Sequence, residues 1–268
     1  DVLDQVTIGQ ITASNANVAI TTSGSILDSD TVTAQADDST VDIIALGLRI
    51  DAGKGVGVLF VNSLGQDVNA LETSITTLSA IVKGSDGINI LESNGLVIND
   101  VISKVNTAKA VSVQTVSLNA TTSESTETIQ SDVVTTGANG LNGSIVIRTT
   151  AGNIELNEGT ATTDLESDAA IVAHGSGNIL LQAIGAGTDI IAYANADIQS
   201  TSGHITLLAG RNVAFTAGAD ITTTTTGTVD VEAGSGSIHF SPTTNISSGS
   251  GDIRLYGAQN VTLGGVIS

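Results

Sequence analysis

The chain has 268 residues and a mass of 26.7 kDa, with 30 glycines, one proline, 2% aromatic residues and no cysteine, methionine or tryptophan. Hydrophobic residues still make up 40% of it and the mean hydropathy is +0.28, which excludes disorder as the main state. The net charge of −19 excludes a basic surface for nucleic acid, and the lack of cysteine excludes disulfides and zinc-thiolate sites.

Strand-like stretches separated by turns fill the N-terminal half and continue to residue 156. They cover residues 41–50, 56–61, 87–91, 95–98, 111–118, 143–148 and 152–156. We interpret them as strands of a coiled fold with long turns, and we expect the polar, Ser/Thr-rich segments 119–142 and 157–169 to project as loops. The acidic pairs Asp28 with Asp30 and Asp37 with Asp38 are predicted to be solvated turns rather than metal ligands.

The segment 71–82 is compatible with two structures. Leu71, Ile75, Leu78 and Val82 are spaced by four, three and four residues and precede Gly84, which is typical of an amphipathic helix. The threonines of the same segment favour a strand. Helix and strand both stay open here, because short apolar patterns do not separate the two periods.

The C-terminal half repeats itself. Four segments align, and they read Gly177-Asn-Ile-Leu-Leu-Gln-Ala, Gly203-His-Ile-Thr-Leu-Leu-Ala, Gly227-Thr-Val-Asp-Val-Glu-Ala and Gly251-Asp-Ile-Arg-Leu-Tyr-Gly. Their glycines are 26, 24 and 24 residues apart. Apolar residues stand two and four places after each glycine, with mostly polar residues between them. This period of two predicts a strand with one buried face.

Two further strand families lie within each repeat. The second is predicted from the pairs Ile191/Tyr193, Val213/Phe215, Ile238/Phe240 and Val261/Leu263, and the third from Asp197-Ile198, Asp220-Ile221 and Asn245-Ile246. Three strands in about 24 residues predict one coil of a parallel β-helix, in which each strand pairs with its equivalent in the next coil. We therefore expect one all-β domain over residues 1–268, irregular over 1–142 and regular over 143–268.

The repeat pattern resembles that of a known family. The pattern Gly-x-Ile-x-Leu-x-Ala, with 210–222 (Gly-Arg-Asn-Val-Ala-Phe-Thr-Ala-Gly-Ala-Asp-Ile-Thr) and 257–265, resembles the repeats of filamentous-haemagglutinin-like adhesins. Segments 47–57 and 70–78 are similar to parts of very long bacterial surface proteins of that type. The resemblance covers most of the chain and is strongest from residue 143 onward. It implies a right-handed β-helix, secretion, and a role at the bacterial surface or in a filament.

Several side chains are candidates for chemistry. Asp197 and Asp220 are predicted to stack near the third corner of the coil, either as Asx side chains that bind turn backbone or as a weak Ca²⁺ site. Asp230 and Arg254, 24 residues apart, are predicted to form an ion pair between adjacent coils. No catalytic or cofactor-binding residue is predicted, and apart from that Ca²⁺ alternative no cofactor is expected.

Other residues are assigned to the core or to the surface. The three histidines, His174, His204 and His239, are predicted to be surface residues. An aromatic ladder of Tyr193, Phe215 and Phe240 with Leu263 is predicted to face the core, because these residues share one phase with the apolar strand positions. Leu180, Leu208 and Tyr256 are expected to form a small outward apolar stripe.

We interpret the chain as a non-catalytic structural or adhesive stalk module of a large bacterial cell-surface or secreted protein. It begins at Asp1 without a signal peptide, so we expect a processed chain or a piece of a longer one. The first alternative is a filament subunit that stacks head to tail, and the second is a polysaccharide-active β-helix enzyme. Expected partners are other segments of the same protein, further copies, and a host-cell or carbohydrate ligand. Nucleic acid and membrane insertion are not expected.

Overall fold

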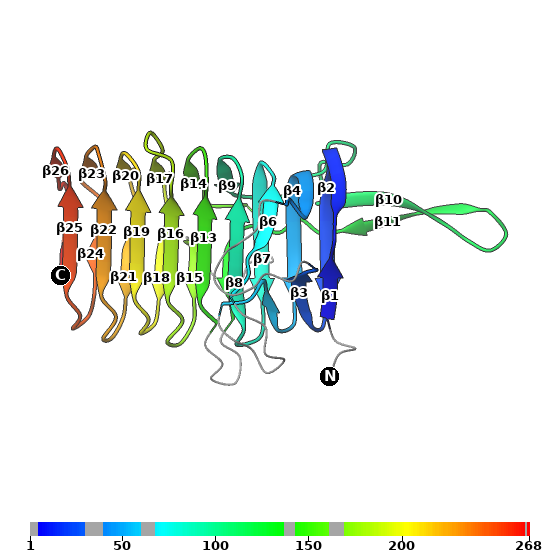
Figure 1. The fold of residues 1–268 in the computed structure, drawn as a ribbon, viewed down its shortest axis with the longest axis horizontal. Coiled ribbons are helices and arrows are strands. Elements are labelled where there is room, and N and C mark those ends of the chain that lie inside the picture. The colour runs from blue at the N-terminus through cyan, green and yellow to red at the C-terminus, as the bar shows by residue number, and fades with distance from the viewer. Residues whose placement is uncertain (1–4, 30–39, 60–67, 137–142, 161–168, 266) are drawn as a thin grey trace.

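The strands of this chain pair in parallel, coil upon coil. The computed structural model describes residues 5–29, 40–59, 68–136, 143–160, 169–265 and 267–268. Strands make up 53% of the structure, the described residues form no helix, and every strand pairing in the main sheet is parallel. The predicted parallel β-helix is therefore confirmed (Figure 1). No helix long and apolar enough to span a membrane occurs in the described part of the chain.

The first wall of the rod is its most regular one. It is built from β1 (Gln5–Ile8), β3 (Ser25–Asp28), β5 (Gly55–Val56), β6 (Leu71–Ser74), β8 (Gly87–Glu92), β13 (Ile145–Thr149), β16 (Ile179–Ala183), β19 (Ile205–Ala209), β22 (Val229–Ala233) and β25 (Ile253–Gly257). β5 and β6 both pair with β8, so one coil supplies this wall with two short strands.

Two shorter walls close the coil. The second contains β9 (Leu96–Ile98), β14 (Ile154–Leu156), β17 (Ile190–Ala192), β20 (Val213–Phe215), β23 (Ile238–Phe240) and β26 (Val261–Thr262). The third contains β7 (Thr77–Val82), β12 (Val133–Thr135), β15 (Ala169–Ala173), β18 (Asp197–Ser200), β21 (Ile221–Thr223) and β24 (Ile246–Ser247). β2 (Ile11–Thr22) and β4 (Ile43–Ala52) are long and bend round from the first wall to the third.

The core consists of vertical columns of equivalent residues. One column of the first wall runs through Val6, Ile26, Val56, Ile88, Ile145, Ile179, Ile205, Val229 and Ile253. Every member is β-branched, and the seven between Val6 and Ile253 are at most 2% exposed. Such side chains pack well on a pleated surface when the same residue type recurs at the strand spacing of about 4.8 Å.

Glycine begins the repeat because neighbouring coils approach closely there. A Cβ atom at Gly203, Gly227 or Gly251 would lie 1.9–2.0 Å from the carbonyl oxygen of the equivalent glycine one coil earlier. Any side chain would overlap that carbonyl. The spacing of the glycines in the sequence therefore marks the spacing of the coils.

The ambiguous segment 71–82 is extended. It forms β6 and β7, which pair with β8 and with β4. The strand alternative is thus the right one, because residues 71–82 pair with strands of the neighbouring coils. The helical spacing of its apolar residues is incidental.

The predicted second strand family is wrong by one residue in its first coil. Ile190 and Ala192, and not Ile191 and Tyr193, pair with Val213 and Phe215. Tyr193 is 38% exposed and its hydroxyl donates a hydrogen bond to Glu155 Oε2 at 3.2 Å. The sequence does not distinguish the two possible phases of this strand, because residues 190 and 191 are both isoleucine and either could face the core.

Two further assignments of apolar residues are wrong. Leu263 does not belong to the core, since it is 46% exposed in the last coil. Leu180, Leu208 and Tyr256 do not form one stripe. Leu180 pairs with Thr206, whereas Leu208 and Tyr256 share a column with Glu232 between them.

Residues 111–127 leave the coil altogether. The stretch predicted as a coil strand, 111–118, forms β10 (Val111–Val116) and pairs antiparallel with β11 (Thr122–Glu127) in a hairpin that projects from the rod (Figure 1). Polar residues occupy both faces of this hairpin, so it has no apolar face to bury in the core. The expected loop 119–142 also contains β12. Its residues 137–142, and residues 161–168 of the expected loop 157–169, lie outside the described part of the chain.

Replacing Phe215 with Ala should strongly destabilise the fold. Phe215 is fully buried and packs edge-to-face on Phe240, with ring centroids 5.3 Å apart. We expect a loss of about 3–5 kcal/mol in the free energy of unfolding, measured by urea titration. Tyr193→Ala should cost less than about 1 kcal/mol, because Tyr193 lies outside the core. Equal losses of stability in the two variants would contradict the assignment of Phe215 to the core and of Tyr193 to the surface.

Candidate functional site

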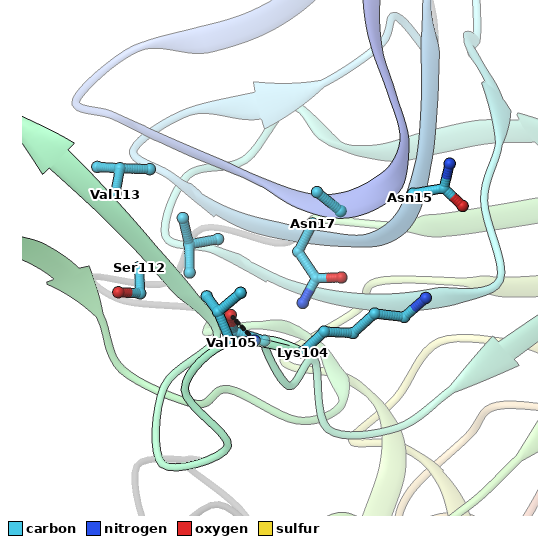
Figure 2. A pocket seen from close by; sticks show the side chains of 9 residues that line it. Asn15, Asn17, Lys104, Val105, Ser112 and Val113 are labelled. Carbon is cyan, nitrogen blue, oxygen red and sulfur yellow. Dashed lines mark hydrogen bonds between the residues drawn. The ribbon is translucent and has the colours of Figure 1, made fainter.

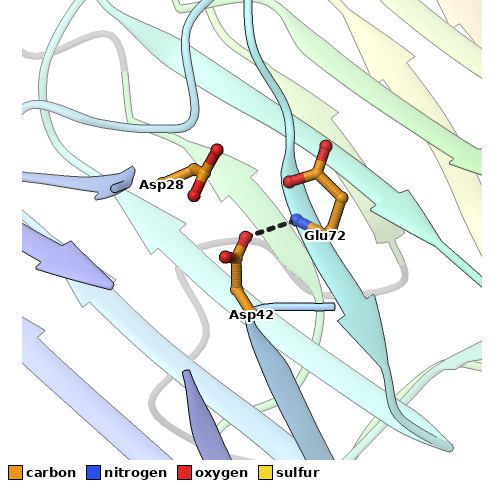
Figure 3. Close-up of side chains that lie close together, drawn as sticks. All are labelled: Asp28, Asp42 and Glu72. Atoms are coloured by element: carbon orange, nitrogen blue, oxygen red, sulfur yellow. Dashed lines mark hydrogen bonds between the residues drawn. The ribbon is translucent and has the colours of Figure 1, made fainter. Parts of the chain in front are cut away.

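Three buried carboxylates converge on neighbouring coils of the first wall. Asp28 ends β3, Asp42 directly precedes β4 and Glu72 lies in β6. Their exposed fractions are 7%, 1% and 4%, and each offers a carboxylate oxygen within 4.8 Å of the others (Figure 3). Among the described residues this is the one group of three acidic, histidine or cysteine side chains close enough to hold a metal ion.

Local hydrogen bonds hold this cluster in place. Asp42 Oδ2 accepts a bond from the backbone N–H of Glu72 at 2.9 Å, and Asp28 Oδ2 accepts one from Asn69 Nδ2 at 2.9 Å. Burial raises the pKa of Asp42 to about 7; the N–H of Glu72 opposes the rise, and the charge of Asp28 adds to it. The cluster is therefore suited to hold a proton, or an oxygen-preferring cation such as Ca²⁺, in place of one negative charge.

Glu92 is a second buried acid nearby in the same wall. It is fully buried at the end of β8, and its carboxylate accepts hydrogen bonds from the Thr73 hydroxyl at 2.7 Å and from the N–H groups of Ile75 and Asn94 at 3.0 and 2.9 Å. Burial nevertheless raises its pKa to about 7. The three donors fix the position of the carboxyl group and link two coils through it.

These raised pKa values predict a stability that falls with rising pH. The folded chain keeps a proton on Glu92 up to about pH 7, whereas the unfolded chain releases it near pH 4.5, so the free energy of unfolding decreases across that interval. The decrease is about 3 kcal/mol for this group. Asp42 contributes with the same sign.

Urea titrations at pH 5 and pH 8 measure this effect. Glu92→Gln should show a smaller decrease than the wild-type chain, because the amide cannot ionise. Glu155→Gln is the matched control and should keep the full decrease, since Glu155 lies at the surface beside Tyr193. An unchanged decrease in Glu92→Gln would assign the pH dependence to other groups.

Asp197 and Asp220 stack at the third corner as predicted. Asp197 Oδ1 accepts a hydrogen bond from the Asp220 N–H at 2.8 Å, and Asp220 Oδ1 accepts one from the Asn245 N–H at 2.7 Å. Asp220 Oδ2 also accepts a bond from Asn245 Nδ2 at 3.1 Å. Each carboxylate thus binds the backbone of the next coil, as expected for the Asx alternative. The Ca²⁺ alternative at this pair stays a prediction.

The other two corners carry the same kind of ladder. In each, a side-chain acceptor receives the backbone N–H of its equivalent one coil later, along Ser144, Asn178, His204 and Thr228 at the first corner and Asn153, Asp189, Asn212 and Ser237 at the second. We call these contacts the corner ladders. Asp42 makes the same contact to Glu72.

The corner ladders predict opposite outcomes for two substitutions of Asp220. Asp220→Asn keeps an acceptor oxygen and should leave the free energy of unfolding within about 0.5 kcal/mol of the wild-type value. Asp220→Ala removes the acceptor for Asn245 and should cost about 1 kcal/mol. Thermal unfolding in Ca²⁺ and in EDTA completes the test. Stabilisation by Ca²⁺ that is lost in Asp220→Asn would support a metal site here instead.

The histidines and the predicted ion pair have structural contacts. His204 Nδ1 belongs to the first corner ladder, His174 Nδ1 lies 2.6 Å from the Thr135 carbonyl oxygen, and His239 is exposed. The ion pair between Asp230 and Arg254 is confirmed, with Arg254 Nε 2.7 Å from Asp230 Oδ1. The histidine contacts and this ion pair all connect adjacent coils or lie on the surface.

Sequence reasoning missed the buried cluster. Asp28 was expected in a solvated turn but is buried, while Asp30, Asp37 and Asp38 lie outside the described residues. A signal was present, because Asp42-Ile43 repeats the acid-isoleucine pattern of the third corner. Nothing in the sequence placed Glu72 beside it, since that proximity depends on the pairing of β4 with β6.

The outer surface has a hollow at the base of the hairpin. It has a volume of about 230 Å³ and is bordered by Asn15 and Asn17 of β2, Lys104 and Val105, and Ser112 and Val113 of β10, among others (Figure 2). This volume lies below the range typical of small-molecule sites. The hollow marks the joint at which the hairpin leaves the rod.

Comparison of the chain with protein-family models, curated proteins and solved structures finds no match. The fold is therefore established by its own strand pairing.

Proposed function

We propose that this chain is a non-catalytic structural module, a rod-like β-helical segment of a large bacterial cell-surface or secreted protein that holds other segments apart. The observation that carries the proposal is the unbroken β-branched column from Val6 to Ile253. Nine strands in that column at about 4.8 Å give a rod about 40 Å long. The resemblance to adhesin repeats supports the extracellular location, and a carbohydrate or host-cell ligand stays part of the hypothesis.

The placement of charged residues supports the non-catalytic role over a polysaccharide-cleaving enzyme. Such an enzyme needs acids and a cationic group around an open groove. The three converging acids, however, are at most 7% exposed, out of reach of a polymer. Arg211 and Arg254 are each bound to aspartates of the neighbouring coil, at Asp189 and Asp230.

A second candidate function is head-to-tail assembly, favoured by the strands at the two ends. Natural sheet edges are commonly protected by charged residues or proline. β1, β2 and β26 contain neither, and the charged residue of β25, Arg254, is paired with Asp230 of the preceding coil. Apart from Arg254, the described strands at the two ends therefore contain none of these protecting residues.

The rod predicts a fixed distance between the ends of the module. Fluorescent proteins fused to the two termini should report one narrow distribution of separations by single-molecule energy transfer, the same in millimolar Ca²⁺ and in EDTA. A broad distribution, or one that shifts with mild urea well before unfolding, would contradict the spacer function. New reducing ends released from polysaccharides by the purified chain would contradict the non-catalytic role.

A further inference from the structure

The hairpin β10–β11 is anchored to the outside of the first coils. Its flanking segments bind β2 and β4 through three hydrogen bonds: Asn17 Nδ2 donates to the Ala110 carbonyl at 2.9 Å, Arg49 Nε to the Thr128 carbonyl at 3.1 Å and Gln130 Nε2 to the Ile50 carbonyl at 2.8 Å. The chain leaves the coil after β9 and returns to it at β12. The insertion thus lies along the outer side of the second and third walls, back toward the first coil.

The hairpin then continues past the end of the rod. Figure 1 shows it extending along the rod axis beyond β1 and β2. Val113 and Val116 are 50% and 70% exposed, and Leu118 at its tip is fully exposed. An isolated two-stranded ribbon is only marginally stable in water. Val113 and Val116 lie on opposite faces of the ribbon, so the observation that points to a partner is the direction of the hairpin past β1 and β2.

The core columns end in residues of the same type at both ends of the rod. The first-wall column ends in Val6 at one end and Ile253 at the other, and both are only partly buried. The third-wall column begins at Ile20 and ends at Ile267, which is 41% exposed. Stacking the last coil of one copy on the first coil of another would continue both columns with β-branched residues in parallel pairing.

We propose that the hairpin is a clamp for a second copy of this chain: the β25–β26 end of that copy stacks on β1 and β2, and the hairpin lies along its third wall. This inference rests on the second candidate function, head-to-tail assembly. In this arrangement the hairpin would contact the second copy as the flanking segments of the insertion contact β2 and β4 of their own copy.

The length of the hairpin fits a specific place on the second copy. Six residues of β10 at about 3.4 Å each span about 20 Å, or about four coils. We count from the end of the second copy that stacks on β1 and β2. Its first four coils contribute Ile267, β24, β21 and β18 to the third wall. A hollow of about 130 Å³ lies at that level, lined by Val172, Gln199 and Thr222 among others. The tip residue Leu118 would reach this hollow.

Charge sets the conditions for this contact. The net charge of −19 makes copies repel each other, and the repulsion is screened over about 10 Å at 0.1 M salt. Gln199 and Thr222, which face outward in the third wall, are uncharged, but Asp197 next to Gln199 and Glu124 of β11 are both acidic. Association should therefore strengthen as the salt concentration rises.

Sedimentation velocity tests the clamp. The wild-type chain and a variant in which residues 112–126 are replaced by an Asn-Gly turn are compared over a concentration series in 0.5 M NaCl. We expect head-to-tail oligomers of the wild-type chain and at least tenfold weaker association of the shortened variant, with an unchanged melting temperature showing that the rod is intact. Equal association of both would overturn the clamp and leave head-to-tail assembly standing. A wild-type chain that stays monomeric would overturn both.

Cross-linking locates the contact, because the chain contains no cysteine. Leu118→Cys is mixed with Thr222→Cys, and a short bis-maleimide should join the two variants. Thr206→Cys is the matched control, since Thr206 faces outward in the first wall of the same coil and should give no product. Equal yields at positions 206 and 222 would overturn the proposed docking along the third wall.

Discussion

The structure depends on one constraint: each residue of a coil lies on its equivalent in the next coil at the spacing of a parallel sheet. Whatever stands at a position must therefore pack against, or bond to, residues in the same position above and below. For the interior this selects β-branched residues, as in the column from Val6 to Ile253. For the repeat glycines it forbids a side chain, because the coils touch through their backbones there.

The corner ladders are the polar consequence of the same constraint. A turn between walls exposes backbone N–H groups that the strands do not pair, and each needs an acceptor. A short side chain in one coil can accept the N–H of the equivalent residue in the next coil, as Asn178 does for His204. The same contact can recur in every coil. This explains why Asp, Asn, Ser and Thr recur at corners, where each can accept the N–H of its equivalent in the next coil. Acidic residues used in this way also account for part of the strongly negative charge.

The regular coils could be predicted from the sequence, and the irregular ones could not. The glycine spacing, the alternation around Ile179 and the Asp-Ile corners each follow from local contacts that repeat, so the sequence shows them directly. The phase of the strand at Ile190 was misassigned because two adjacent isoleucines satisfy the same alternation. The cluster of Asp28, Asp42 and Glu72 depends on which short strands pair across long insertions, and no local pattern carries that information.

The departures from the repeat are concentrated in the first four coils. The buried acids, Glu92 and the insertion with its hairpin all lie between β3 and β12, whereas the coils from β16 onward differ mainly in their outward residues. An insertion there does not interrupt the columns, because the chain returns to the next wall in register, as β12 does on β7. A parallel β-helix can therefore add a projecting arm without losing its core. Specific contacts of this module are best sought where the repeat is broken.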